Sequence, residues 1–144
     1  MSALYAESSA ILRWLLGHGE GPAIQRSLAS ADSIVTSALT GVEVTRTLRR
    51  LAAVRQISTG DGERILAIYA TAARHWKVHS ITDAVLTRAS EPFPVEPIRS
   101  LDAIHLATAL LYNREAPLAG VLTSDERVRD NADALGLSGP PDPA

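Results

Sequence analysis

The chain contains no cysteine, and this absence excludes several kinds of chemistry at once. Disulfides, thiolate zinc sites and cysteine nucleophiles all require that residue. No apolar run approaches the 18 residues that suggest a membrane-spanning helix, and the N-terminal residues do not show a basic region followed by an apolar one. We therefore expect a cytoplasmic protein that does not associate with membranes.

Lysine is nearly absent too, since Lys77 is the only lysine among the 14 Lys and Arg residues. Arginine favours bidentate contact with carboxylate or phosphate groups, but a GC-rich genome explains the same bias, and the abundant alanine supports that explanation. The formal net charge is -2, so no overall basic field indicates a nucleic-acid partner. A glycine-rich phosphate loop is also missing, because "GHGEG" follows a helical pattern rather than a strand.

The 144 residues are typical of one domain, 46% hydrophobic and 21% charged. A chain of this length buries about two-thirds of its unfolded surface. The last six residues, "GPPDPA", contain three prolines and no apolar periodicity. We predict a single domain over residues 1–137 and a flexible C-terminal tail over residues 138–144.

Short apolar segments alternate with helical patterns along the whole chain. Strands are predicted at residues 2–6, 33–36, 76–81 and 118–124. Helices are predicted at residues 8–16, 22–29, 37–54, 63–75, 82–89, 100–113 and 125–135, the sixth with Ser100 as its N-cap. This alternation indicates an α/β fold, a three-layer α/β/α sandwich with a central parallel sheet. The carboxyl ends of all strands would then lie at one edge, where such sheets bind ligands.

Four acids fall just past a predicted strand or early in a predicted helix: Glu7, Glu43, Asp102 and Asp125. In a parallel sheet these side chains could converge on one edge. Converging carboxylates raise each other's pKa unless a cation compensates for their charge. Because the acids have no evident lysine or cysteine companion, such a cluster suits Mg²⁺ or Mn²⁺, which prefer oxygen ligands.

Each acid also has a simpler interpretation. An acid in a first helical turn is most often a cap or a partner of the helix dipole, and this holds above all for Asp125. The case for Asp102 is stronger, because Ser100 already offers a cap. Asp102 heads a polar stripe that faces either solvent or a site, and we expect His105, one turn later, to pack or to orient Asp102. Glu43 could instead belong to a solvated, salt-bridged stripe.

At this point the residues resemble a known family. The stretches "YAESSAILRWLL", "TSALTGVEVTRTLRRL", "IRSLDAIHLATAL" and "VLTSDERVRDNADALGL" look like the PIN-domain family, and more narrowly like the VapC-type toxins of bacterial toxin–antitoxin pairs. The resemblance spans residues 2 to about 137, with all motifs in order. The most specific pieces are "LDAIHLATAL" and "LTSDERV", whereas residues 55–90 are generic.

The resemblance implies an endoribonuclease that depends on Mg²⁺, or on Mn²⁺, and forms a homodimer. It also implies that a cognate VapB-like antitoxin holds the enzyme inactive. The family's metal-binding and catalytic acids map to Glu7, Glu43, Asp102 and Asp125, and two hydroxyl residues that support the site map to Ser8 and Thr123. The first acid departs from the family, which typically has aspartate there. The longer side chain of Glu7 leaves three outcomes open: direct ligation, ligation through water, or a weakened site.

Arginines on the helix of Glu43 are candidates for contact with RNA phosphate. Arg50 lies two turns beyond Glu43 on the same face, and Arg46 and Arg13 are alternatives. A solvated basic face, or a surface for the antitoxin, would explain these residues equally well. Two other functions compete with the nuclease: a catalytically weakened PIN-like module that binds RNA or protein, and a haloacid-dehalogenase-like phosphatase. The phosphatase requires a paired aspartate motif after the first strand, and "YAESS" does not provide one.

Overall fold

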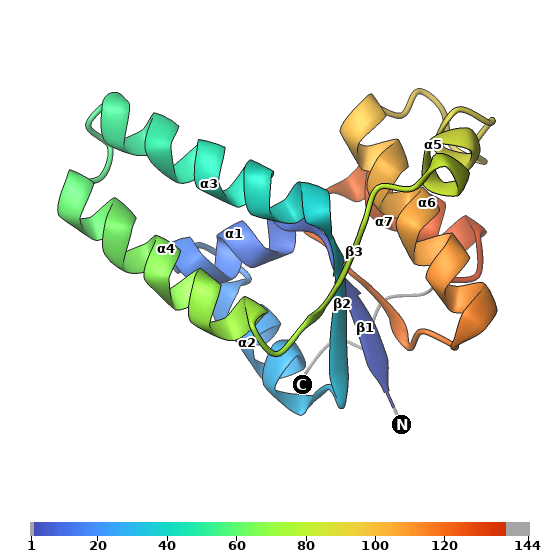
Figure 1. The fold of residues 1–144 in the computed structure, drawn as a ribbon, viewed down its shortest axis with the longest axis horizontal. Coiled ribbons are helices and arrows are strands. Elements are labelled where there is room, and N and C mark those ends of the chain that lie inside the picture. Colours follow the sequence, from blue (N-terminus) through green and yellow to red (C-terminus); the bar gives the residue numbers. More distant parts are fainter. Residues whose placement is uncertain (1, 138–144) are drawn as a thin grey trace.

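Four short strands form one sheet in which every neighbouring pair runs parallel (Figure 1). In this computed structural model, which describes residues 2–137, the order across the sheet is β3-β2-β1-β4. The predicted tail at 138–144 lies outside the described residues. The strands are β1 (Ala3–Ala6), β2 (Ser33–Ser37), β3 (Lys77–His79) and β4 (Gly120–Leu122).

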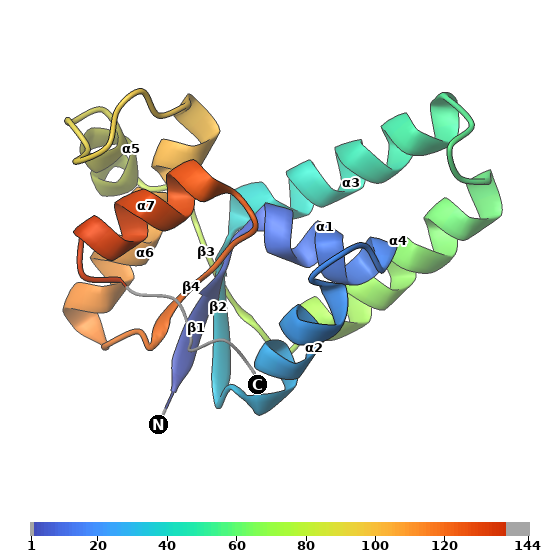
Figure 2. The same ribbon diagram turned by 180° about the vertical axis from the view of Figure 1, so that it is seen from behind.

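Helices cover both faces of this sheet. One face carries α1 (Ser8–Leu16), α2 (Gly21–Ser30), α3 (Ala38–Ala53) and α4 (Thr59–Ala73). The other face carries α5 (Asp83–Ala89), α6 (Ser100–Glu115) and α7 (Glu126–Ala134). Figures 1 and 2 show the two groups on opposite sides of the strands. The predicted three-layer α/β/α sandwich with a central parallel sheet is therefore confirmed.

The central strands supply both halves of the core because successive side chains of a strand point to opposite faces. Leu4 and Ala6 of β1 pack with Ile34 of β2 against the helices α1, α3 and α4. Tyr5 of β1 and Val35 of β2 point to the other face, where they pack with Phe93 and with residues of α6 and α7. Apolar residues therefore occupy successive positions of β1 and the middle of β2, as expected of strands covered on both faces.

The predicted start of one helix and the predicted N-cap of another are not found in the structure. Helix α4 begins at Thr59 rather than at residue 63, because the Ser58 side chain accepts a hydrogen bond from the Asp61 amide at 3.0 Å. The glycines of "STGDGE" had suggested a turn, but Gly60 and Gly62 both belong to the helix, and Gly62 is buried. The prediction that Ser100 is an N-cap is wrong: α6 begins at Ser100, and its N-cap Arg99 makes no side-chain capping bond.

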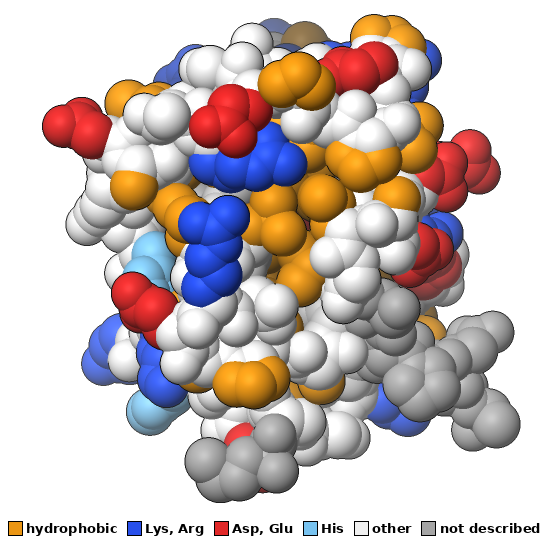
Figure 3. All heavy atoms as spheres, turned by 90° about the vertical axis from the view of Figure 1, so that its right-hand side faces the viewer, with side chains coloured by type: hydrophobic (Ala, Val, Ile, Leu, Met, Phe, Trp, Pro, Cys, Tyr) orange, Lys and Arg blue, Asp and Glu red, His pale blue; other side chains and the backbone are white. Residues whose placement is uncertain are grey.

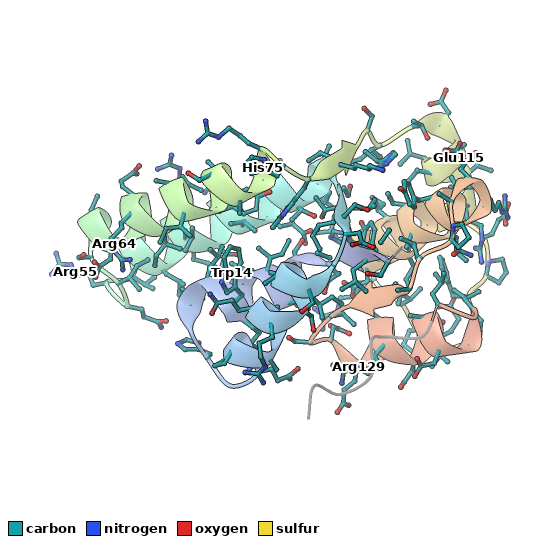
Figure 4. The ribbon with its side chains drawn as sticks, turned by 90° about the horizontal axis from the view of Figure 1, so that it is seen from below. Trp14, Arg55, Arg64, His75, Glu115 and Arg129 are labelled. Carbon is teal, nitrogen blue, oxygen red and sulfur yellow. The ribbon has the colours of Figure 1, made fainter. Side chains whose placement is uncertain are left out.

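Helices α3 and α4 form a long hairpin that extends beyond the sheet (Figure 1), with Arg55 at its tip (Figure 4). On the opposite side of the molecule, formed by α5–α7, hydrophobic side chains gather in a shallow hollow (Figure 3). Within residues 2–137, none of the helices combines the length and the apolar composition needed to cross a bilayer.

Candidate active site

Glu7 lies at the junction where β1 ends and α1 begins. Its backbone amide continues the pairing of β1 with β4 by donating to the Leu122 carbonyl at 3.0 Å. Its side chain turns back as the N-cap of α1 and accepts a hydrogen bond from the Ser9 amide at 3.1 Å. Glutamate is not among the preferred N-cap residues, since its carboxylate must fold back to reach the helix end. The side chain is only 3% exposed.

Two hydroxyl groups hold the other oxygen of Glu7. Oε2 accepts hydrogen bonds from Ser9 Oγ and from Thr123 Oγ1, the latter at 2.8 Å. The same hydroxyls receive the amides of the loop that follows β4: Ser124 N donates to Ser9 Oγ at 2.9 Å, and Asp125 N donates to Thr123 Oγ1 at 3.0 Å. Glu7 is thereby tied to the loop that carries Asp125, although the two residues are far apart in sequence.

Glu43 is placed by α3, the helix that follows β2, and is anchored through one oxygen. Oε1 accepts hydrogen bonds from Ser8 Oγ at 2.5 Å and from His105 Nε2 at 2.6 Å. Burial raises the pKa of Glu43, but the hydrogen bonds from His105 and Ser8 outweigh it, so the net pKa is lower than usual. Glu43 is therefore held as a carboxylate. His105 was expected to pack or to orient Asp102: it is buried in the core, and its ring bonds to Glu43 rather than to Asp102.

Asp102 lies in the first turn of α6 and makes no side-chain hydrogen bond or ion pair with any residue of the described chain. Its pKa is raised from 3.8 to about 6. Burial is the largest cause, followed by the negative charges of Asp125 and Glu7, while His105 and Arg99 act in the opposite direction. The charges of two other predicted acids, Asp125 and Glu7, thus act on Asp102 at the carboxyl edge of the sheet.

Asp125 caps α7, as the simpler interpretation of this residue predicted. Its Oδ1 accepts hydrogen bonds from the amides of Arg127 and Val128, at 2.9 and 3.1 Å. Its Oδ2 accepts none from residues 2–137. Capping and metal binding are compatible here, because a carboxylate has two oxygens and the cap uses one. The cap also fixes the direction in which the second oxygen points.

The carboxylate oxygens of the four acids are the type of ligand that a hard divalent cation prefers, although the four side chains do not surround a single position. Among residues 2–137, no three acidic or histidine side chains are already close enough to hold one ion. Mg²⁺ needs fewer protein ligands than that, because it typically binds one or two carboxylates and completes its shell with waters and phosphate oxygens. Glu43 Oε2, Asp125 Oδ2 and both oxygens of Asp102 have no hydrogen-bond partner in the described chain.

The predicted supporting and RNA-binding residues have different positions. Thr123 contacts Glu7, as expected of a hydroxyl before the last acid. Ser8 contacts Glu43 rather than the neighbouring Glu7. Arg46 and Arg50 are exposed on α3 and form no ion pair within residues 2–137. Their role in binding RNA therefore stays a prediction.

Two residues of the site were missed by the sequence analysis. Ser9 bonds to Glu7 and to the β4–α7 loop, and Tyr5 bonds to His105 at 2.7 Å. Ser9 could have been suspected, since an acid at an N-cap presents its carboxylate to the residue two positions later. Nothing in the local sequence singles out Tyr5, which reads as an ordinary core residue of a strand.

The predicted acids lie towards the carboxyl edge of a parallel α/β sheet, which is the edge where proteins of this class bind their ligands. A sequence model described as the PIN domain matches residues 4–134. The chain therefore belongs to the PIN-domain family.

Similarity to individual proteins narrows the position of the chain within this family. It is 34% identical over 137 residues to the ribonuclease VapC35 of Mycobacterium tuberculosis, with 94% of this chain and 93% of that protein covered. It is 35% identical over 138 residues to the ribonuclease VapC46 of the same organism, with 96% of each covered. The crystal structure of M. tuberculosis VapC20, described as a toxin that cleaves the sarcin–ricin loop, superposes with a TM-score of 0.63. At 16% identity, over 93% of this chain and 95% of that one, the superposition shows a shared fold. The chain is thus a PIN-domain protein of the VapC type.

Proposed function

We propose that the chain is an endoribonuclease toxin that hydrolyses RNA phosphodiester bonds in the cytoplasm with the help of Mg²⁺ or Mn²⁺. The observation that carries the proposal is the set of carboxylate oxygens of Glu43, Asp102 and Asp125 that have no hydrogen-bond partner within residues 2–137. Burial, followed by the charges of Asp125 and Glu7, raises the pKa of Asp102 among them. Carboxylates that repel one another at a sheet edge gain stability when a cation binds between them. The VapC-type relatives are themselves named ribonucleases, which supports RNA as the substrate.

Each acid has a separate task in this proposal. Glu43, Asp102 and Asp125 would hold the metal through the oxygens that the protein leaves without partners. Glu7 would contribute its charge and would hold the β4–α7 loop in place through Ser9 and Thr123. When bound, the divalent cation supplies Lewis-acid polarisation of the phosphate and activation of a water. The exposed guanidinium groups of α3 would neutralise the RNA backbone on either side of the cleaved bond.

Incubation with total RNA tests this function directly. We expect the purified chain to cleave RNA in Mg²⁺ or Mn²⁺ and to lose that activity in EDTA, because the acids need a cation to act together. The Asp102→Asn variant, prepared in the same way, should be inactive in either metal. Cleavage in every lane, EDTA and variant included, would identify a contaminating nuclease. Binding of RNA without cleavage in any lane would support the alternative, a catalytically weakened PIN-like binding module.

We also propose two protein partners, a cognate antitoxin of the VapB type and a second copy of the chain. An open groove of about 560 Å³, lined mostly by apolar atoms of α1 and α4, supports the first. Trp14, Arg64 and His75, labelled in Figure 4, line it. An apolar segment of an antitoxin would bury this surface.

The edge strand β3 supports the second partner, another copy of the chain, because its Val78 side chain is 52% exposed. Light scattering of the purified chain should therefore give about twice the mass of 15.3 kDa.

A further inference from the structure

A continuous line of hydrogen bonds runs from the core of the sheet to the acidic edge. The Tyr5 hydroxyl lies 2.7 Å from His105 Nδ1, and His105 Nε2 lies 2.6 Å from Glu43 Oε1. Tyr5 and His105 are 0% and 1% exposed, so water does not compete for either bond. The two rings also meet edge to face, with their centroids 5.9 Å apart. Tyr5 and His105 come from β1 and α6, and Glu43 from α3, so the line connects three elements.

The protonation of Tyr5 gives this line a direction. Burial and the nearby charge of Glu7 raise the pKa of Tyr5 well above its usual value, so its hydroxyl keeps the proton. A hydroxyl that donates to Nδ1 leaves that nitrogen as an acceptor, and Nε2 then donates to Glu43. The carboxylate of Glu43 only accepts, so it favours the same arrangement. The two contacts together hold the His105 ring in one orientation.

The second donor to Glu43 acts on the same oxygen. Ser8 Oγ lies 2.5 Å from Oε1 and 3.0 Å from His105 Nε2, so hydroxyl, ring and carboxylate form a closed triangle. Oε1 is therefore occupied by two protein donors, while Oε2 has no partner among residues 2–137. Holding one oxygen in this way fixes the rotation of the carboxylate and the direction of the other.

We propose that Tyr5 and His105 are positioning residues for Glu43: the Tyr5 hydroxyl holds the His105 ring at Nδ1, and His105 with Ser8 holds Oε1 so that Oε2 faces the metal. The proposal rests on the metal-binding role of Glu43 under the proposed function. Partners that hydrogen-bond a metal ligand typically change metal affinity or activity about 10- to 100-fold when they are lost. A buried histidine that only fills space would not discriminate between substituents of similar polarity.

Two amide substitutions at one position separate positioning from packing. The side-chain nitrogen of His105→Gln lies close to the place of Nε2 and can still donate to Glu43. The amide of His105→Asn lies close to the place of Nδ1, where it meets Tyr5 but does not reach Glu43. We expect His105→Asn to weaken Mn²⁺ binding, measured by isothermal titration calorimetry without RNA, by about tenfold or more. His105→Gln should keep most of the wild-type affinity, and RNA cleavage should follow the same order.

Tyr5→Phe tests the contact at Nδ1 with an almost isosteric change. In the wild-type background it should weaken Mn²⁺ binding, because the His105 ring loses the hydrogen bond that holds it on the side away from Glu43. In the His105→Gln background it should have no further effect, since the glutamine amide takes the place of Nε2 and does not reach Tyr5. Thermal denaturation of each variant confirms that it is folded.

The outcomes separate this inference from the function on which it rests. Equal Mn²⁺ affinities for the asparagine and glutamine variants, whether weakened or not, would overturn the positioning role while the nuclease remains. Equal effects of Tyr5→Phe in both backgrounds would also overturn it. If the wild-type chain neither binds Mn²⁺ nor cleaves RNA, the proposed function fails, and the positioning role fails with it.

Discussion

Asp102→Asn is expected to abolish metal-dependent RNA cleavage and, in the absence of metal, to make the protein more stable. Asp102 has no partner of its own in the described chain and is repelled by Asp125 and Glu7. Removing its charge relieves this repulsion and also removes a ligand of the proposed metal. Loss of a group that holds a catalytic ion should lower the cleavage rate by more than about 100-fold. A functional residue that costs stability is common at active sites.

The stability change depends on pH in a direction that follows from the raised pKa. Folded Asp102 has a pKa of about 6, against 3.8 as the usual value. The folded state therefore binds a proton more readily than the unfolded state, and wild-type stability falls as the pH rises from about 4 through about 6. The Asp102→Asn variant does not lose stability in this pH range, because asparagine does not ionise. Its stability relative to wild type should therefore be unchanged near pH 4, increase between about pH 4 and pH 6, and stay constant above about pH 7.

The size of the gain is limited by solvent. A shift of this size corresponds to about 3 kcal/mol for a fully shielded group, and screening of the half-buried Asp102 reduces it to about 1–2 kcal/mol. Thermal denaturation in EDTA should then show a melting temperature about 3–6 °C above wild type at pH 8.

Asp130→Asn is the matched control, because it removes the same charge from an exposed position on α7. It should change neither cleavage nor the pH dependence of stability. Loss of cleavage by Asp102→Asn with no gain in stability would contradict the crowding of carboxylates around Asp102. A stabilised variant that still cleaves RNA would remove Asp102 from the catalytic site.

The positions of the acids could be predicted from the sequence, but their partners could not. The acids occur just after predicted strands or early in predicted helices. Because parallel strands share a direction, this pattern places the acids at one edge of the sheet. The partners depend on packing between segments that are remote in sequence. Glu7 and Thr123 are 116 residues apart, and His105 and Glu43 are 62 residues apart. No local pattern indicates such pairs.

Ser8 illustrates the same limit at short range. Adjacent residues at the start of a helix point in different directions, about 100° apart around its axis. Ser8 therefore faces Glu43 and His105, while Ser9 faces Glu7 and the β4–α7 loop. A hydroxyl residue next to the first acid was expected to support the site, and in the structure it contacts a different acid, Glu43. The family resemblance pointed to Ser8, but the geometry of the helix determines that Ser8 contacts Glu43.

Glu7→Gln is expected to lower metal-dependent cleavage by about tenfold or more, whereas Glu7→Asp should keep or raise it. Glutamine has the shape of Glu7 and retains an oxygen for the Ser9 amide, so it removes the charge with little change in the cap of α1. Aspartate keeps the charge, is a preferred N-cap residue and has the length typical of the family. Initial rates of RNA cleavage in Mn²⁺ measure both variants.

A second measurement separates a ligand from a cap. The charge of Glu7 raises the pKa of Asp102, so Glu7→Gln should shift the pH dependence of metal-free stability towards lower pH, and Glu7→Asp should not. Equal cleavage by wild type and Glu7→Gln, together with this shift, would show that Glu7 acts on Asp102 without taking part in metal binding. Both oxygens of Glu7 already accept hydrogen bonds from Ser9 or Thr123. Any direct ligation must therefore use lone pairs that these bonds leave free, and the glutamine variant tests whether such ligation supports catalysis.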